Sequence, residues 1–301
     1  MRILVLGGTG YLGRHVTERL RALPGARVLA AGRSSAAEFR VDLATDRPER
    51  LAKTLAAAAP DAVVNCAGAT GGDPVTLAEV NARGPAVLCA ALREAAPRAR
   101  LVHLGSAAEY GPGTPDVPVA ESAPACPVTP YGVTKLAGTI AVTSAVLGGV
   151  VLRVGNPVGP GAPVASLPGR MASLLRSAGA GPEAVLRLGD LSAYRDFVDV
   201  RDVAGAVTLA ATTPGHLPPV INIGGGTAMA VRELVRGLAR RAGFQGKLEE
   251  STGGSARSVR VSWQCSDITA ADRALGWRPA HDLEDALDAL WAATTESGPV
   301  P

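Results

Sequence analysis

Residues 2–13 read R-I-L-V-L-G-G-T-G-Y-L-G, an apolar run that leads directly into a glycine-rich turn. The run is too short for a helix and is bounded by glycines, which indicates a buried parallel strand. Gly7, Gly10 and Gly13 follow it with the spacing G-x-x-G-x-x-G, ahead of a segment of helical length. Glycine lets the backbone approach a pyrophosphate, and the helix N-terminus supplies amide donors. The stretch therefore predicts a dinucleotide-binding fold.

Further short apolar runs alternate with segments of helical length. The runs are 27–31, 62–66, 101–104 and 150–154, and the helical segments are 11–23, 49–59, 75–96 and 131–147. This alternation predicts an α/β protein with a doubly wound parallel sheet, a Rossmann domain over residues 1–155 that binds NAD(P). Residues 156–301 are richer in Pro and Gly, which predicts a smaller, irregular substrate-binding part that ends in an amphipathic helix near 283–292. Residues 197–226 are expected to return to the main sheet through a strand at 220–223.

Composition argues against several classes of protein. The formal net charge is only +3 over 301 residues and the arginines are dispersed, which argues against a nucleic-acid surface. No uninterrupted apolar run reaches the roughly 18 residues of a membrane span, and the first strand begins too early for a signal peptide. Cys66, Cys89, Cys126 and Cys265 form no C-x-x-C pair, so neither a disulfide framework nor a metal site is expected. We therefore expect a cytoplasmic protein with no membrane or nucleic-acid partner.

The end of the second predicted strand, A-A-G-R-S-S at residues 30–35, indicates the choice of coenzyme. An acidic residue is expected there when the ribose 2′-hydroxyl of NAD is bound. Arg33 and Ser34 instead offer donors suited to a 2′-phosphate. NADP(H) is therefore favoured, and NAD(H) stays possible. Asp42 is placed to bind the adenine amino group, and the N-C-A-G stretch at 65–68 closes the third strand beside the cofactor.

A candidate catalytic set lies in two further stretches. Tyr131 and Lys135 stand four residues apart in P-Y-G-V-T-K and therefore share one helix face. The ammonium can stabilise a phenolate, which makes tyrosine a usable acid at neutral pH. Ser106 lies upstream in L-V-H-L-G-S-A-A-E-Y-G, and His103 in the same stretch is expected to be a packed core histidine.

These motifs together resemble the extended short-chain dehydrogenase/reductase family, particularly its nucleotide-sugar epimerases, dehydratases and ketoreductases. The resemblance covers nearly the whole chain and includes V-N-A-R-G (80–84), L-R-V-G-N-P-V-G-P-G (152–161), Y-R-D-F-V-D-V-R-D-V-A (194–204) and D-I-T-A-A-D-R-A-L-G-W-R-P (267–279). It implies that Ser106 holds the substrate oxygen, that Tyr131 donates or removes its proton, and that Lys135 binds the nicotinamide ribose. It also implies a homodimer formed through the helical segments 75–96 and 131–147. The residues assigned to the cofactor are Gly7, Gly10, Tyr11, Leu12, Gly13, Arg33, Ser34, Asp42, Leu43, Cys66, Ala67, Gly68, Asn81, Tyr131 and Lys135.

The resemblance also assigns residues to the substrate. Asn156 and Arg195 stand where related enzymes bind a nucleotide diphosphate, and Arg257 falls near a second such arginine, with Arg260 as a rival. Two guanidiniums would balance a diphosphate through charge-assisted hydrogen bonds. The residues assigned to a nucleotide-diphosphate sugar are Ser106, Ala107, Asn156, Arg195 and Arg257.

Departures from the family pattern narrow the reaction. Family 4,6-dehydratases carry an Asp-Glu pair after the active-site hydroxyl, whereas Ala107 and Ala108 stand here and cannot act as acid or base. Glu109 is expected to point the other way if the strand continues. Family 4-epimerases commonly hold NAD with an acidic residue at the position that Arg33 takes. The sequence therefore predicts NADPH-dependent reduction of a ketone on a nucleotide-diphosphate sugar, first of all the 4-keto group of an NDP-4-keto-6-deoxyhexose. An NAD(P)-dependent epimerase, a reductase of a free aldehyde, flavonoid or sterol ketone, and a non-catalytic NADP-binding sensor remain alternatives.

Overall fold

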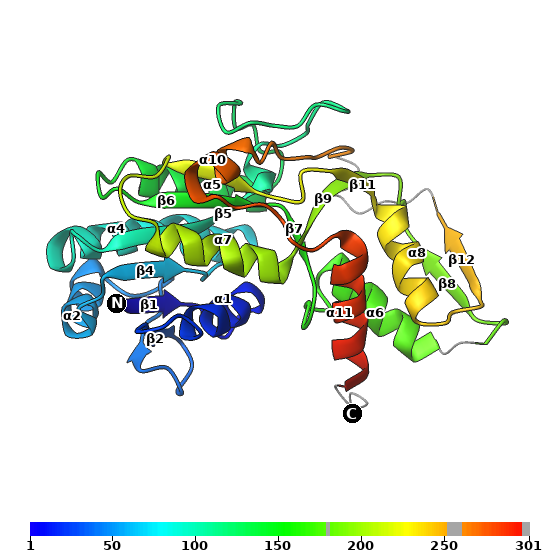
Figure 1. Cartoon of the computed structure of the whole chain (residues 1–301), viewed down its shortest axis with the longest axis horizontal. Helices are drawn as coiled ribbons and strands as arrows, with labels where there is room; N and C mark the ends of the chain where they lie inside the picture. The colour runs from blue at the N-terminus through cyan, green and yellow to red at the C-terminus, as the bar shows by residue number, and fades with distance from the viewer. Residues whose placement is uncertain (179–180, 252–260, 297–301) are drawn as a thin grey trace.

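The computed structural model describes residues 1–178, 181–251 and 261–296, and its largest feature is a sheet of seven parallel strands (Figure 1). The strand order is β10-β6-β5-β4-β1-β2-β3. The strands are β1 (Arg2–Leu6), β2 (Arg27–Gly32), β3 (Phe39–Arg40), β4 (Ala62–Asn65), β5 (Arg100–Ser106), β6 (Val150–Val154) and β10 (Val220–Ile223). This order confirms the predicted doubly wound sheet, and β10 is the expected returning strand, paired in parallel with β6.

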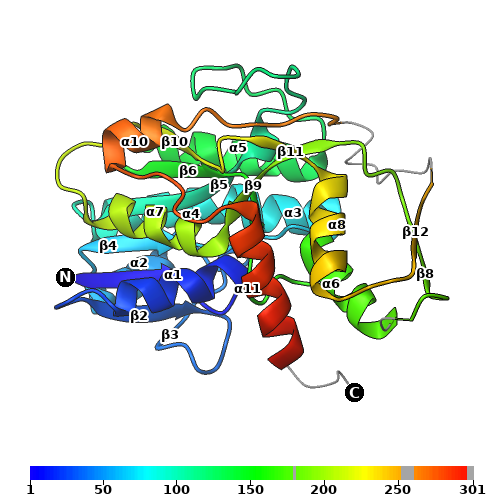
Figure 2. The same ribbon diagram turned by 45° about the vertical axis from the view of Figure 1, so that its right-hand side comes forward.

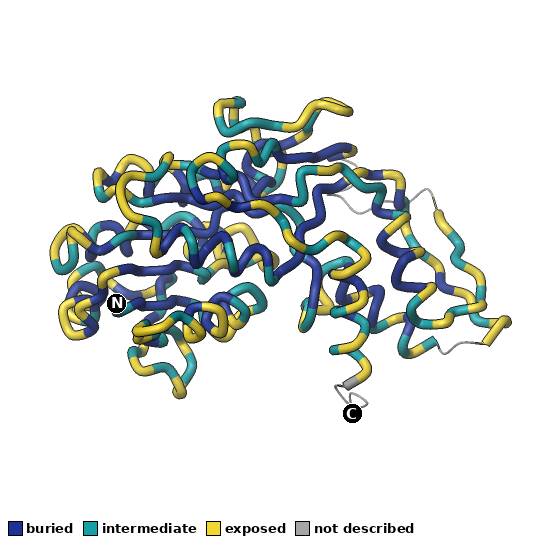
Figure 3. Tube along the Cα trace, viewed as in Figure 1, coloured by how far each residue is buried: buried dark blue, intermediate teal, exposed yellow. Residues whose placement is uncertain are grey.

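Helices cover both faces of this sheet, and β1 shows how the sequence specifies the two cores. Ile3 and Val5 pack with α1, α7 and α10, whereas Leu4 and Leu6 pack with α2, α4 and α5 on the opposite face. Successive side chains of a strand point to opposite faces, so a strand covered on both sides is apolar at every position. Figure 3 shows the resulting buried strands at the centre of the larger part. The helices are α1 (Tyr11–Arg21), α2 (Pro48–Ala58), α4 (Gly84–Ala95), α5 (Pro130–Thr143), α7 (Val200–Thr212) and α10 (Thr269–Leu275).

The segment expected as one helix over 75–96 is divided into three. A short helix, α3 (Pro74–Ala78), leads into a π-helical turn, η1 (Glu79–Arg83), which is followed by α4. Asn81 lies in this wider turn, where its side chain accepts from the Ala69 N–H at 2.9 Å and donates to the Ala69 carbonyl at 2.8 Å. Pro85 at the start of α4 has no N–H to continue a regular α-helical ladder. The predicted helical segment is therefore confirmed over Pro74–Ala95, and its π-helical turn falls where Asn81 binds a neighbouring loop.

The smaller part of the molecule, seen beside the main sheet in Figures 1 and 2, has its own hydrophobic core. Its described residues form a three-stranded sheet in the order β11-β9-β7, a two-stranded sheet of β8 and β12, and three helices. These elements are β7 (Asn156–Val158), α6 (Leu167–Ala178), β8 (Val185–Leu188), β9 (Tyr194–Asp199), β11 (Ala228–Ala230), α8 (Val231–Arg241), β12 (Lys247–Glu250) and α11 (Leu283–Glu296). Met171, Leu234 and Leu287 are fully buried among the three helices. The predicted C-terminal helix is confirmed as α11, whereas the domain boundary at 155/156 stays a prediction.

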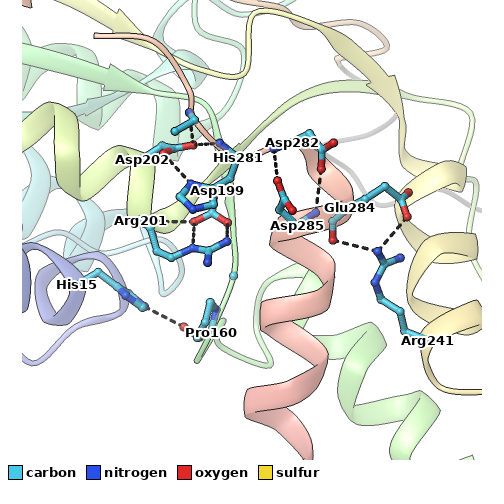
Figure 4. Close-up of polar contacts among 12 residues, drawn as sticks. His15, Pro160, Asp199, Arg201, Asp202, Arg241, His281, Asp282, Glu284 and Asp285 are labelled. Carbon is cyan, nitrogen blue, oxygen red and sulfur yellow. Dashed lines mark hydrogen bonds and ion pairs between the residues drawn. The ribbon is translucent and has the colours of Figure 1, made fainter.

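Polar contacts join the two parts where α7, α1 and the segment before α11 meet (Figure 4). The buried Asp202 carboxylate accepts from the backbone N–H groups of Ala280 at 3.1 Å and His281 at 2.9 Å. The same carboxylate lies 2.9 Å from His281 Nδ1. On the other side, His15 Nε2 of α1 lies 2.9 Å from the Pro160 carbonyl oxygen. These contacts fix the loop after β7 and the segment before α11 against the larger part.

Candidate active site

The glycine-rich turn between β1 and α1 forms a cradle that admits no side chain. Gly7 has φ +74°, and a Cβ on it would lie 2.7 Å from the backbone nitrogen of Ala67. A Cβ on Gly13 would lie 2.0 Å from the Gly7 carbonyl oxygen. Gly10 is the N-cap of α1, so no side chain covers the first-turn amides. The cradle therefore fits the pyrophosphate of a dinucleotide.

Tyr11 and Leu12 follow in the first turn of α1, where their side chains contact protein. The Tyr11 hydroxyl donates to the Gly159 carbonyl at 3.4 Å, and burial raises its pKa above the ordinary value. Leu12 packs against the core cluster on the α1 face of the sheet. The backbone amides of these two residues at the helix N-terminus, rather than their side chains, are therefore available to a dinucleotide.

The end of β2 presents two guanidiniums. Arg33 is exposed, and the half-buried Ser34 accepts a hydrogen bond from the Ala36 N–H at 3.2 Å. Arg40, which was not predicted from the sequence, lies on β3 and pairs in register with Gly32, the residue before Arg33. Within the described part of the chain, neither guanidinium forms an ion pair. Because β3 has only two residues, no apolar pattern predicts that Arg40 joins this edge of the sheet.

The turn after β3 is held rigidly by backbone contacts. The Asp42 carboxylate accepts from the Ala44 N–H at 3.1 Å, and the Asp42 N–H donates to Asp46 at 2.9 Å. Leu43 is buried in the core. Arg83 of η1 donates to the carbonyl groups of Leu43, Ala44 and Asp46, at 2.8 to 3.1 Å. Asp42 is thus fixed in a half-exposed position at the carboxyl edge of the sheet.

Three of the residues assigned to the cofactor converge at the end of β4. The Asn65 side chain accepts from the Ala67 N–H at 3.1 Å and shapes the chain there. A Cβ on Gly68 would lie 3.4 Å from Asn81 Oδ1 and 3.9 Å from Lys135 Nζ. The missing side chain of Gly68 thus lets β4, η1 and α5 come close together.

Two uncharged groups lie beneath this point. Burial raises the pKa of the Cys66 thiol to about 12. Burial, and then the Lys135 ammonium, hold the pKa of His103 well below its ordinary value. The His103 ring is 1% exposed and its Nδ1 lies 3.1 Å from Asn65 Nδ2, which confirms the expected core histidine. Both groups are therefore neutral at neutral pH.

Ser106 and Tyr131 come from elements in direct contact. Ser106 ends β5, and its Oγ accepts from the Ala108 N–H at 3.2 Å. Tyr131 is half-buried in the first turn of α5, which Thr129 caps by accepting from the Gly132 N–H at 3.1 Å. A Cβ on Gly132 would lie 2.5 Å from the Ala108 carbonyl oxygen. The start of α5 therefore packs closely against the turn that follows Ser106.

Lys135, one helical turn after Tyr131, is 5% exposed, and its Nζ donates to the Leu104 carbonyl. Burial lowers the Lys135 pKa to about 8, against the opposing effects of Glu109 and Cys66. An amine with this pKa is mostly protonated at neutral pH. Its positive charge can stabilise a phenolate one turn earlier in the helix.

The residues assigned to the substrate are only partly described. β7 and β9 pair in parallel with Asn156 opposite Phe197, two residues from Arg195. The structure therefore brings Asn156 and the buried Arg195 to neighbouring strands. Arg257 and Arg260 lie outside the described residues.

Two buried side chains that hold the turn after Ser106 were not assigned to the site from the sequence. The chain turns at η2 (Ala107–Glu109), and Glu109 accepts from the Ser106 N–H at 2.7 Å. The strand ends at Ser106, so the condition under which Glu109 was expected to point the other way is not met, and S-x-x-E is instead a capping-box spacing. Gln264 Nε2 donates to the Ala107 carbonyl at 2.7 Å from 157 residues away, a distance at which the sequence offers no signal.

Residues 1–178, 181–251 and 261–296 present neither a metal-binding cluster nor a membrane-spanning helix. No group of three or more His, Cys, Asp or Glu side chains there could hold a metal ion. No helix there is long and apolar enough to cross a membrane.

Known proteins resemble this chain over nearly its full length. A model of the NAD dependent epimerase/dehydratase family matches residues 3–224. The dTDP-6-deoxy-L-talose 4-dehydrogenase (NAD(P)(+)) of Kitasatospora kifunensis is 41% identical over 97% of this chain and 95% of that protein. The structure of RMD from Pseudomonas aeruginosa complexed with NADPH has a TM-score of 0.83 at 25% identity, over 98% of this chain and 99% of that one. MoeE5 in complex with UDP-glucuronic acid and NAD has a TM-score of 0.85 at 25% identity, over 99% and 100%. The chain therefore belongs to the NAD-dependent epimerase/dehydratase family, within the extended short-chain dehydrogenase/reductase group of NAD(P)-dependent nucleotide-sugar epimerases and oxidoreductases.

Proposed function

We propose that this protein uses NADPH to reduce the 4-keto group of an NDP-4-keto-6-deoxyhexose. The observation that carries the proposal is the turn after Ser106, where Ala107 and Ala108 place no acid or base beside the serine, while Tyr131 and Lys135 occupy the adjacent helix. Such a site supports proton transfer to one oxygen and lacks the carboxyls of an eliminating enzyme. The relative from Kitasatospora kifunensis is named for oxidation at a sugar C4, the reverse of this reduction.

Each catalytic side chain has a separate task in this proposal. The nicotinamide, when bound, supplies the hydride. The Ser106 hydroxyl holds the carbonyl oxygen of the substrate, and Tyr131 gives that oxygen its proton. Lys135 stabilises the phenolate that remains and binds the nicotinamide ribose. Proton transfer of this kind contributes typically 10²–10⁴-fold, and the close packing of α5 on η2 supplies the positioning.

The preference for NADPH rests on the edge of the sheet at β2 and β3. Arg33 directly follows β2, and Arg40 pairs with Gly32 on the adjacent β3; neither forms an ion pair among the described residues, and Ser34 adds a hydroxyl. Guanidiniums bind phosphate through charge-assisted and often bidentate hydrogen bonds. A 2′-phosphate at this edge would meet two of them. The remaining cofactor residues, from Gly7 to Asn81, would hold the pyrophosphate, adenine and ribose.

Asn156 and Arg195 are proposed to bind the diphosphate of the substrate. They lie on the paired strands β7 and β9, which lead from the main sheet into the smaller part. A substrate anchored there would extend its sugar toward the end of β5, where Ser106 stands. Truncation of Arg195 should raise the substrate KM sharply and spare NADPH affinity.

We also propose that the protein is a homodimer, formed through α4 and α5. Val133 and Ile140 of α5 are 51% and 55% exposed, and their spacing of seven residues places them on one helix face that a second subunit could cover. Light scattering of the wild type should give twice the chain mass, and Ile140→Glu should give the monomer. A monomeric wild type would contradict the proposal. The cytoplasmic location stays a prediction.

The decisive assay follows NADPH absorbance with a thymidine-diphosphate 4-keto-6-deoxyhexose as substrate. We expect substrate-dependent oxidation by the wild type and none by Tyr131→Phe, which keeps the ring and loses the acid. Turnover of a nucleotide sugar without added cofactor would favour an epimerase. Tight NADPH binding without turnover of any carbonyl compound would favour a sensor, and activity on free ketones alone would overturn the nucleotide-sugar assignment.

A further inference from the structure

The Glu109 carboxylate lies at the centre of a closed hydrogen-bond network beneath the candidate catalytic set. It is fully buried, and one oxygen accepts from the Ser106 backbone N–H at 2.7 Å. The other oxygen accepts from the Thr139 hydroxyl and from Arg153 Nε, each at 2.8 Å. One side chain therefore connects the end of β5, helix α5 and strand β6.

The surrounding chain is shaped to admit this carboxylate. A Cβ on Gly105 would lie 2.8 Å from Glu109 Oε1 and 2.7 Å from Val151 Cγ1, so the position before Ser106 requires a glycine. On the far side, the Arg153 guanidinium lies 4.4 Å from the centre of the Tyr110 ring. A buried charge pair is expensive to desolvate, and a merely structural contact could be made by apolar side chains. The Glu109–Arg153 pair lies directly beneath the candidate catalytic set, and this position indicates a role in catalysis.

The Glu109 network contacts both elements that carry the catalytic residues: β5, which ends at Ser106, and α5, which carries Tyr131 and Lys135. Thr139 stands one helical turn after Lys135, so the two side chains share one face of α5. Lys135 itself is tied to β5 through the Leu104 carbonyl, two residues before Ser106. β5 and α5 are thus joined at two points, one through Lys135 and one through Glu109.

The titratable groups that interact with Lys135 come from several elements packed around it. Glu109 of η2 stabilises the ammonium and so raises the Lys135 pKa, and Arg153 of β6 forms an ion pair with Glu109 at 2.8 Å. Cys66, which directly follows β4, and His103 of β5 also interact with Lys135, and both are neutral at neutral pH. Tyr131 lies on the same helix, one turn earlier. Glu109 is therefore a carboxylate whose negative charge acts on this buried lysine.

We propose that Glu109 is a positioning residue of the catalytic set. Its charge supports the Lys135 ammonium, its hydrogen bonds hold the Ser106 backbone against α5, and Arg153 balances it. The effect on turnover rests on the proposed reductase function, whereas the effect on Lys135 does not.

The chain allows a direct test because its lysines stand only at positions 53, 135 and 247. Protein labelled with ¹³C at the lysine side chain should give three NMR signals, two from the exposed Lys53 and Lys247 and one from Lys135. The pH titration of the third signal reports the Lys135 pKa without any sugar substrate. In Glu109→Gln we expect this pKa to fall by about one unit, because the opposite charge is lost. In Arg153→Gln it should rise, because the charge of Glu109 is no longer balanced.

Thr139→Val is the matched control, since it removes one hydrogen bond to Glu109 and no charge. Its Lys135 signal should titrate as in the wild type. With the ketosugar and NADPH, Glu109→Gln should lower kcat more than tenfold and leave the KM for NADPH unchanged. If Glu109→Gln does not fold, the Lys135 titration in Arg153→Gln tests the proposal instead. An identical Lys135 titration in the wild type and the charge variants would overturn the proposal, whereas a shifted titration without turnover of any ketosugar would overturn only the proposed reaction.

Discussion

We expect the buried Lys135 ammonium to lower the free energy of unfolding of this protein. Burial brings its pKa from 10.5 to about 8, so the folded chain holds this proton less tightly than the unfolded chain. The difference corresponds to about 3 kcal/mol at about 1.4 kcal/mol per pH unit. The cost is present in full below about pH 8 and disappears as the pH rises through 10.5, where the unfolded lysine also loses its proton.

Lys135→Met removes this charge and keeps the aliphatic stem. The variant loses the hydrogen bond to the Leu104 carbonyl, which costs about 1 kcal/mol. A net gain of about 2 kcal/mol in the free energy of unfolding remains at pH 7. The matched control is Lys53→Met, an exposed position at which the change should stay within about 0.5 kcal/mol.

Urea unfolding of both variants and the wild type at pH 7 and pH 10 measures the effect. We expect Lys135→Met to be the most stable of the three at pH 7, to lose its advantage at pH 10, and to lack ketoreductase activity. A Lys135→Met protein that is less stable than the wild type at pH 7 would refute the reasoning, as would a gain that is equal at both pH values.

Three further predictions concern the cofactor site and the junction. Gly13→Ala should lose measurable NADPH binding in a fluorescence titration, because its Cβ would lie 2.0 Å from the Gly7 carbonyl oxygen; Gly71→Ala, with nothing within 4 Å, should bind normally. Arg33→Ala should raise the KM for NADPH about tenfold or more and leave that for NADH unchanged; equal effects on both would exclude a phosphate contact. Asp202→Ala should lower the free energy of unfolding by about 2–4 kcal/mol in urea, because the junction loses three contacts, whereas the exposed Asp288→Ala should have little effect.

The main sheet could be predicted because its signals are local. A buried parallel strand is a short apolar run, as at residues 2–6, and a dinucleotide turn needs glycine at positions such as Gly7 and Gly13 for steric reasons visible in the sequence. The i, i+4 spacing of Tyr131 and Lys135 likewise predicted that the two side chains share one helix face, and α5 contains both residues.

The residues that support the site could not be predicted in the same way. Gln264 and Arg153 reach the turn after Ser106 from distant parts of the chain, and only the fold brings them there. Arg40 depends on a two-residue strand. The π-helical turn at Asn81 departs from the regular helix that the apolar pattern favours, because one side chain binds the Ala69 backbone.

The most direct test of the proposed reaction is transfer of deuterium from 4-deuterated NADPH, labelled on the transferred face, to a nucleotide-linked 4-keto-6-deoxyhexose. The reductase proposed here should give a 6-deoxyhexose product with deuterium at sugar C4, in step with the NADPH consumed. Mass spectrometry and NMR of the product locate the label. A product without deuterium at C4, or an epimerised sugar formed while NADPH is not consumed, would contradict the proposal.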